Sequence, residues 1–291
     1  MYGSIKKVAA IHDLSGFGRA SLTAIIPTLS AMGVQVCPLP TAILSNHTGG
    51  FDHYSYVDLT DSMEEYIGVW KELDLKFDCI YTGFLGSTKQ IKIVSDFIDH
   101  FGTADNLVLV DPVMGDNGKL YSSFNNDIIP QMRKLIKKAD FITPNFTEAG
   151  FLLGIMEAPE EPTDEVIKDW LRRLSDMGPK FVAITSVPDI KHRENTNVIA
   201  YDRKGDTFWK IGCRYIPAAY PGTGDVFASV LIGSLLQGDS LPVALDRAVQ
   251  FISQCIKASY GFNYPKRNGV LLEKELGILN MPVIISGYEM I

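Results

Sequence analysis

Short apolar runs alternate with longer segments of helical spacing along most of the chain, and this pattern constrains the fold more than any other feature. Lys7–Leu14 is strand-like, and the apolar residues of Ser21–Met32 recur at helical spacing up to Gly33, a residue type that commonly follows a helix. The alternation continues with strand-like runs at 34–44, 78–81 and 107–110 and helical segments at 61–73 and 87–101. Parallel strands joined by helices are covered on both faces. We therefore predict a three-layer α/β fold with a mainly parallel central sheet.

The second half of the chain continues the alternation and adds a hairpin. Helical segments are expected at 132–138, 146–153, 164–177, 225–237 and 241–259, and strands at 141–142 and 181–185. Within 197–216, two strand-like runs flank the polar segment Asp202–Gly205, which is typical of a β-hairpin. No internal repeat, linker or change of composition interrupts the sequence, so we predict a single domain over residues 1–291.

Composition excludes several classes of partner. The net charge of -7, without any block of Lys or Arg, gives no electrostatic reason to bind nucleic acid or an anionic membrane. Val226–Leu236, the richest apolar run, is shorter than the ~20 residues of a membrane span. The N-terminus lacks the apolar segment of a signal peptide, and the four cysteines form no CxxC pair. We expect a cytoplasmic protein with reduced thiols.

Two glycines precede an acidic residue in the segment Gly222-Thr223-Gly224-Asp225, directly before an apolar helical segment. Glycines let backbone N–H groups turn toward a ligand, and the start of a helix favours negative charge. Asp225 can then accept a proton from a hydroxyl group while the N–H groups stabilise a migrating phosphoryl group. The alternative interpretation is that Asp225 is simply the N-cap of the helix.

Carboxylates also follow two of the predicted strands. Asp111 and Asp116 lie at and just beyond the end of the strand at 107–110, and Asn145 and Glu148 follow the strand at 141–142. Ligands of open α/β sheets bind at this carboxyl edge, and oxygen ligands of this kind suit Mg²⁺. Turn chemistry for the two aspartates and a capping box for Asn145 and Glu148 are the alternatives.

These three motifs, in this order, resemble the ribokinase superfamily. Three further segments resemble its pyridoxal kinase branch: Ser45-Asn46-His47-Thr48-Gly49, Thr82-Gly83-Phe84 and Ile142-Thr143-Pro144-Asn145. The resemblance extends from Val8 to about Ser259. The resemblance implies an ATP-dependent kinase that phosphorylates the 5′-hydroxymethyl group of a vitamin B6 compound. It also implies Mg²⁺, possible help from K⁺, and a homodimer.

The resemblance assigns roles to individual residues. Asp225 would be the general base, and Gly222, Thr223 and Gly224 would form the anion hole. The substrate would contact Thr48, Gly49 and Phe84. Residues at strand ends or in the anion hole would surround the phosphates of Mg-ATP: Asp111, Asp116, Thr143, Asn145, Glu148, Thr185, Ser186 and Thr223. Of these, Asp111, Thr143 and Glu148 would lie nearest the metal. Thr48 and Thr185 can also be read as ordinary strand-end hydroxyls.

Asp13 departs from the family pattern, which usually has a serine soon after the first strand. We hypothesise that Asp13 selects among B6 compounds or pairs with a protonated pyridine nitrogen, with Ser15 replacing the usual hydroxyl. A turn cap is the alternative role for Asp13.

Other functions remain open at this stage. Hydroxymethylpyrimidine (phosphate) kinase shares the fold, although that branch usually has a cysteine at the position of Asp225. A relative that binds B6 or nucleotide without chemistry would not need Asp225 and Glu148. A dinucleotide site at Gly16–Ser21 is disfavoured because Ser21 replaces the third glycine, and no P-loop motif is present.

Overall fold

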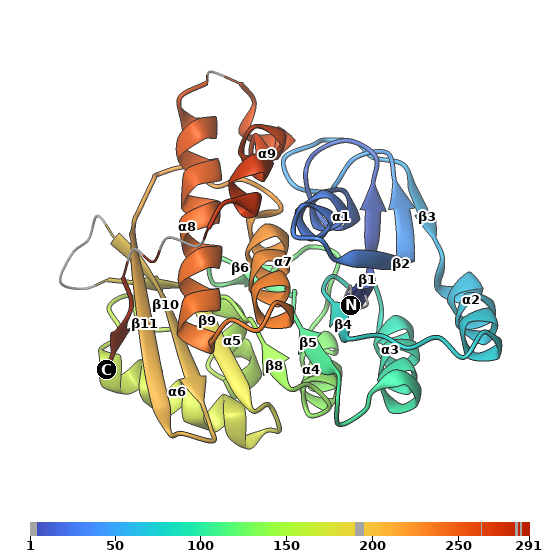
Figure 1. The fold of residues 1–291 in the computed structure, drawn as a ribbon, viewed down its shortest axis with the longest axis horizontal. Coiled ribbons are helices and arrows are strands. Elements are labelled where there is room, and N and C mark those ends of the chain that lie inside the picture. Colours follow the sequence, from blue (N-terminus) through green and yellow to red (C-terminus); the bar gives the residue numbers. More distant parts are fainter. Residues whose placement is uncertain (1–4, 190–194, 263, 283–284, 286) are drawn as a thin grey trace. The chain divides into compact units, whose positions relative to one another are not determined.

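The computed structural model describes residues 5–189, 195–262, 264–282, 285 and 287–291. Its contacts divide the chain into two compact units, one formed by Met1–Ile80 with Ile216–Ser286 and the other by Tyr81–Tyr215 with Gly287–Ile291. Figure 1 labels the helices and strands of both units.

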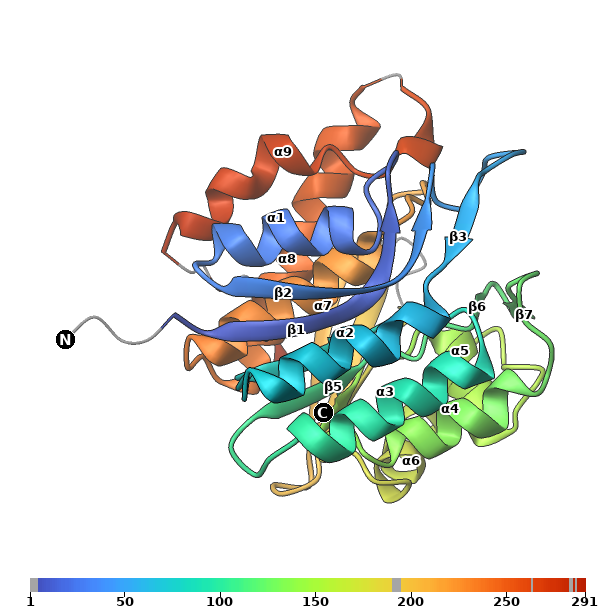
Figure 2. The same cartoon turned by 90° about the vertical axis from the view of Figure 1, so that its right-hand side faces the viewer.

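The first unit has helices on both faces of its strands. Parallel pairing joins β1 to β2, and β3 adds an antiparallel edge. Figure 2 shows α1 on one side of β1 and β2 and α2 on the other. The buried residues Leu22, Ile25 and Leu29 lie on one face of α1, which explains why this helix packs on the strands. The elements are β1 (Lys7–Ser15), α1 (Leu22–Ala31), β2 (Gln35–Leu44), β3 (Tyr56–Asp58), α2 (Thr60–Glu72), α7 (Thr223–Leu236), α8 (Leu241–Tyr260), η1 (Lys266–Asn268), α9 (Leu272–Glu275) and η2 (Leu276–Asn280).

The second unit begins in β4 (Cys79–Thr82), which crosses the boundary between the units. Parallel strands β5, β8 and β9 are followed by the antiparallel strands β10, β11 and β12. In Figure 1 the long strands β9, β10 and β11 run side by side. The elements are α3 (Thr88–Phe101), β5 (Leu107–Val110), β6 (Gly115–Asp116), β7 (Lys119–Leu120), α4 (Ile128–Ile136), β8 (Phe141–Ile142), α5 (Phe146–Leu153), α6 (Asp164–Asp176), β9 (Phe181–Pro188), β10 (Asn195–Asp202), β11 (Thr207–Arg214) and β12 (Glu289–Met290).

The predicted fold class is confirmed: the chain has a three-layer α/β fold with a large, mainly parallel central sheet. The hairpin is confirmed as β10 and β11, whose turn lies after Asp202. Sequence analysis missed β3, β12 and the small pair β6 and β7, which have only two or three residues each and carry too little periodicity to be recognised. The equally short β8 was predicted from its two apolar residues. Among the described residues, no helix is long and apolar enough to cross a membrane. The single domain stays a prediction.

Candidate active site

Gly222 sets the geometry at the start of α7. It is the N-cap, with φ of 79°. A Cβ atom at this position would overlap the carbonyl oxygen of Arg19 and lie 2.9 Å from Cα of Ala20, so only glycine fits. No described residue accepts a hydrogen bond from the backbone N–H groups of residues 222–225. This helix start therefore has the unpaired donors and the positive dipole end of an anion-binding site.

Asp225 lies within the first turn of α7 and is not its cap, so the simple N-cap interpretation is wrong. Its Oδ2 accepts a hydrogen bond of 2.8 Å from the N–H of Ser21. Its Oδ1 lies 3.8 Å from Nδ1 of the fully buried His12, and 15% of the Asp225 side chain is exposed. Burial, with a smaller contribution from the charge of Asp13, raises the pKa of Asp225 to about 7. A carboxylate of this kind is suited to general base catalysis near neutral pH.

Asp13 lies next to this carboxylate and is itself bound by two serines. The hydroxyl of Ser21 donates a 2.6 Å hydrogen bond to Oδ1 and that of Ser15 a 2.9 Å bond to Oδ2. Burial raises the pKa of Asp13. Ser15 is fully buried, so its hydroxyl is occupied inside the protein by Asp13. Sequence analysis singled out Asp13 and Ser15 but missed Ser21, which joins Asp13 to Asp225.

His47 holds the loop that carries Thr48 and Gly49. The N–H of Gly49 donates to its Nδ1 at 3.1 Å, and its Nε2 lies 2.6 Å from the carbonyl oxygen of Arg267. An accepting Nδ1 and a donating Nε2 define a neutral ring, in agreement with the lowering of its pKa by burial. Both nitrogens bind backbone groups, so His47 organises the loop, whereas Thr48 and Gly49 are exposed.

The ends of three neighbouring strands bring Thr82, Asp111 and Thr143 together in the second unit. The N–H of Asp111 donates to the carbonyl oxygen of Thr82 at 2.8 Å, and that of Thr143 donates to the carbonyl oxygen of Val110 at 3.3 Å. The hydroxyls of Thr82 and Thr143 are buried and have no hydrogen-bond partner in the described part of the chain. Buried polar atoms of this kind usually bind a water, ion or ligand. Beside the carboxylate of Asp111, they fit an ion that keeps its own waters, as Mg²⁺ does.

Asn145 and Glu148 form the capping box of α5. Glu148 Oε2 accepts from the N–H of Asn145, and its Oε1 accepts from the N–H of Met114, each at 2.9 Å. Asn145 Nδ2 also donates to the carbonyl oxygen of Gly115 at 2.8 Å. Burial raises the pKa of Glu148 to about 7. The capping-box interpretation is therefore correct, and any role of these residues toward metal or ATP is additional to it.

The remaining predicted residues also lie in the second unit. Asp116 is in the β6 and β7 hairpin, exposed, and accepts from the N–H of Asn117. Thr185 forms a β-bridge with Asn145, and the following Ser186 has a φ of 57°. The ring of Phe84 packs against Phe124. The predicted residues at the strand ends and Phe84 thus lie in the second unit, whereas Thr48, Gly49 and Thr223 lie in the first.

No group of three or more His, Cys, Asp or Glu side chains in the described ranges is arranged to hold a metal ion. A magnesium site at Asp111 and Thr143 would therefore depend on phosphate oxygens and waters for its other ligands.

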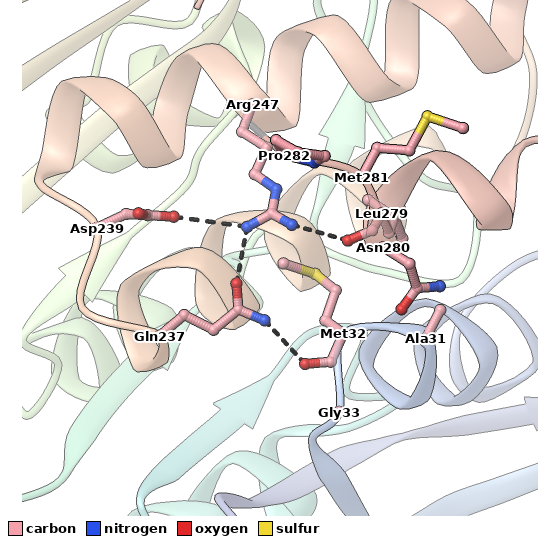
Figure 3. Close-up of a pocket in the computed structure, with 10 residues that line it drawn as sticks. All are labelled: Ala31, Met32, Gly33, Gln237, Asp239, Arg247, Leu279, Asn280, Met281 and Pro282. Atoms are coloured by element: carbon pink, nitrogen blue, oxygen red, sulfur yellow. Dashed lines mark hydrogen bonds and ion pairs between the residues drawn. The ribbon is translucent and has the colours of Figure 1, made fainter. Parts of the chain in front are cut away.

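A separate cavity of about 580 Å³ opens in the first unit between the ends of α1 and α7 and the segment after η2 (Figure 3). Arg247 crosses it, donating to Gln237 Oε1 at 2.8 Å and to the carbonyl oxygen of Leu279 at 2.9 Å, with Asp239 also at 3.5 Å. None of the residues predicted to be catalytic or ligand-binding lines this cavity. Its polar groups bind one another, which is typical of a structural network.

The fold matches the class expected from the sequence, the α/β kinases of small molecules. Residues 16–270 match the family described as phosphomethylpyrimidine kinase, and the chain belongs to this family. Kinase activity is supported by this membership and by the relatives below.

Three relatives illustrate the range of the family. A candidate phosphomethylpyrimidine kinase from Bacteroides thetaiotaomicron, crystallised with pyridoxal, is 56% identical, with a TM-score of 0.95 over 99% of this chain and 100% of that one. Pyridoxal kinase from Lactobacillus plantarum is 31% identical, with a TM-score of 0.86 over 95% and 97% of the two chains. Hydroxymethylpyrimidine/phosphomethylpyrimidine kinase from Bacillus subtilis is 27% identical over 89% of this chain and 92% of its own length.

Proposed function

We propose that this protein transfers the γ-phosphoryl group of ATP to the 5′-hydroxymethyl group of a vitamin B6 compound: pyridoxal, pyridoxine or pyridoxamine. The observation that carries the kinase chemistry is the Asp225 carboxylate, partly exposed beside unpaired N–H groups and with its pKa raised to about 7. The choice of a B6 compound is supported by the 56% identical Bacteroides relative, which was crystallised with pyridoxal.

In the proposed reaction Asp225 acts in its ionised form. It accepts the proton of the substrate hydroxyl as the hydroxyl oxygen forms a bond to the γ-phosphorus, and the bond from that phosphorus to the bridging oxygen of ADP breaks. The N–H groups of Gly222, Thr223 and Gly224 donate to the phosphoryl oxygens, where charge is redistributed in the transition state. The hydrogen bond from the N–H of Ser21 keeps Oδ2 occupied and leaves Oδ1 for the substrate hydroxyl.

The residues at the strand ends of the second unit are proposed to serve ATP. Asp111 and Thr143 would hold Mg²⁺ through its waters, and this ion would offset the negative charge of the phosphates. Glu148 would keep Met114 and Asn145 in place through its two hydrogen bonds. Thr185 and Ser186 would contact the nucleotide. Dependence on K⁺ and a homodimeric state complete the proposal and rest on the resemblance described above, and a cytoplasmic location rests on the sequence features described above.

Hydroxymethylpyrimidine (phosphate) kinase is the second candidate. It is favoured by the family match and by the Bacillus subtilis relative, whose name gives this activity. Asp225 speaks against it because that branch usually has a cysteine at this position. A non-catalytic binder of B6 or nucleotide is the third candidate, and the presence of both Asp225 and Glu148 speaks against it, since binding alone does not require a base.

Purified protein incubated with Mg-ATP and each acceptor in turn tests the proposal. The acceptors are pyridoxal, pyridoxine, pyridoxamine and hydroxymethylpyrimidine, and phosphate ester formation is followed by mass spectrometry. We expect turnover of at least one B6 compound, with loss of activity in Asp225→Asn and full activity in Glu64→Gln, a control at an exposed position of α2. Absence of turnover with every B6 compound would refute the proposal.

A further inference from the structure

Ser21 occupies an unusual position between the two buried carboxylates of the first unit. Its N–H donates to Asp225 Oδ2 at 2.8 Å, and its hydroxyl donates to Asp13 Oδ1 at 2.6 Å. The residue is 8% exposed and immediately precedes α1, yet its side chain makes no capping hydrogen bond to that helix. One residue therefore links Asp13 to the proposed base through its side chain and its backbone.

The backbone of Ser21 adopts a conformation that residues other than glycine rarely take, with φ of 51° and ψ of -135°. Such a conformation costs free energy and persists only where surrounding contacts enforce it. In this conformation the N–H points at Asp225 while the hydroxyl points at Asp13. A relaxed backbone at Ser21 would turn the N–H away from Asp225.

The chain before Ser21 is held tightly, so the position of this residue is well defined. Arg19 and Ala20 pass beside Gly222, and a Cβ atom on Gly269 would lie only 2.8 Å from Cβ of Arg19. The side chain of Arg19 is also bound by Glu273, with 2.7 Å between Nε and Oε2. These contacts fix the path up to Ala20, and the bond to Asp13 is the one that acts on the side chain of Ser21 itself.

We propose that Ser21 is a positioning residue for the phosphoryl-transfer reaction, and that Asp13 acts through it. The hydroxyl of Ser21, anchored on Asp13, holds the strained backbone in which its N–H fixes Oδ2 of Asp225 and directs Oδ1 to the acceptor hydroxyl. This inference rests on the proposed function and deepens it. It gives Asp13 a role inside the protein, in place of direct pairing with a pyridine nitrogen of the substrate.

Ser21 and Asp13 have opposite effects on the pKa of Asp225. The N–H of Ser21 lowers the pKa of Asp225, and the charge of Asp13 raises it by a smaller amount. The other titratable or charged groups on the elements around α7 lie on β1 and α8, since α1 has none. On β1 they are Lys7 and His12, whose Nδ1 is 3.8 Å from Oδ1 of Asp225. The five on α8 are Asp246, Arg247, Cys255, Lys257 and Tyr260. None of these is a cause of the raised pKa.

Three variants separate the inference from its alternatives. Ser21→Ala removes the hydroxyl, and the strained backbone conformation stays unfavourable for alanine. Ser21→Gly also removes the hydroxyl but adopts this backbone conformation easily. Asp13→Asn keeps an acceptor for the Ser21 hydroxyl but removes the charge. The control is Ser240→Ala, because Ser240 is exposed in the same unit and its side chain makes no capping bond. Steady-state kinetics over a range of pH and thermal unfolding are measured for each variant.

For Ser21→Ala we expect kcat to fall about 10- to 100-fold with KM changed by less than about 3-fold, because Asp225 is misplaced while substrate contacts remain. The acid limb of its kcat/KM profile should move to higher pH, and that of Asp13→Asn to lower pH. Ser21→Gly should recover part of the lost kcat. The Ser240→Ala control should match the wild type.

Equal kcat values for Ser21→Ala and wild type, with the acid limb unmoved, would refute the inference. An Asp13→Asn variant that changes KM alone would instead assign Asp13 to the substrate ring and would also refute it. A wild type without any turnover would contradict the proposed function itself, which distinguishes the two failures. If Ser21→Ala does not fold, Ser21→Gly and Asp13→Asn decide the question.

Discussion

Replacing Asp225 by Asn should make the protein less active and more stable. The folded chain holds the proton of Asp225 up to a pH of about 7, whereas the ordinary pKa of an aspartate is 3.8. Between these two values the unfolded chain has lost a proton that the folded chain retains, so the free energy of unfolding falls as pH rises through this window. Asn has no proton to lose, so the variant does not share this fall.

The expected size follows from the same values. Each pH unit in the window corresponds to roughly 1.4 kcal/mol, so the full interval would correspond to roughly 4 kcal/mol. Because 15% of the side chain is exposed, water screens part of this cost. We therefore expect Asp225→Asn to exceed the wild type by about 1–3 kcal/mol at pH 8 and by clearly less at pH 5.

Urea unfolding of both proteins at several pH values from 5 to 8.5 measures the difference directly. Glu148, whose pKa is also raised to about 7, is present in both proteins, so its contribution cancels in the comparison. The Glu64→Gln control should show no growing difference. If Asp225→Asn were equally or less stable than the wild type at pH 8, the inference that ionisation of the buried Asp225 lowers the free energy of unfolding would be wrong.

Four other predictions follow from the site. Gly222→Ala should lower kinase activity by on the order of 10²-fold or more in steady-state assays, because its Cβ overlaps the carbonyl oxygen of Arg19. At pH 5, where Glu148 keeps its proton in the folded chain and no charge is buried, Glu148→Gln should lower the free energy of unfolding by about 1–3 kcal/mol in urea titrations, since Gln offers one acceptor oxygen to two N–H groups. Thr143→Val should leave thermal stability within about 0.5 kcal/mol of wild type yet raise KM for ATP, because the buried hydroxyl has no described partner; an unchanged KM would exclude its role. The kcat/KM of the wild type should rise with pH and level off above about 7, as Asp225 ionises.

The alternation of strands and helices was readable from the sequence because the helices bury one apolar face and the central strands are short, continuous apolar runs. The helix that carries Asp225 was predicted to within two residues, and its glycines suggested an anion site, which stays a prediction. The short strands β3, β6 and β7 were missed, since two or three residues have too little local periodicity and each of these strands is defined by pairing with an adjacent strand.

Which side chains act together was harder to predict than where they lie along the chain. Asp13 and Asp225 were both selected, but nothing in the sequence indicates that Ser21 connects them, because that link depends on a backbone conformation and on contact between residues 204 positions apart. His47 lies in the segment that resembles pyridoxal kinases, and the sequence gives no sign that both of its ring nitrogens bind backbone groups. A Cβ atom on Gly18 would overlap Cδ2 of His47, so this glycine permits the close approach of the ring.

The ratio of kcat/KM for pyridoxal to kcat/KM for hydroxymethylpyrimidine, measured with Mg-ATP and the same protein preparation, tests the central claim most directly. The ratio expresses specificity as a difference in transition-state binding and does not depend on the fraction of active protein. We predict a preference for pyridoxal of at least about tenfold, abolished along with all turnover in Asp225→Asn. A preference of the same size for hydroxymethylpyrimidine, or full turnover of pyridoxal by Asp225→Asn, would contradict the assignment.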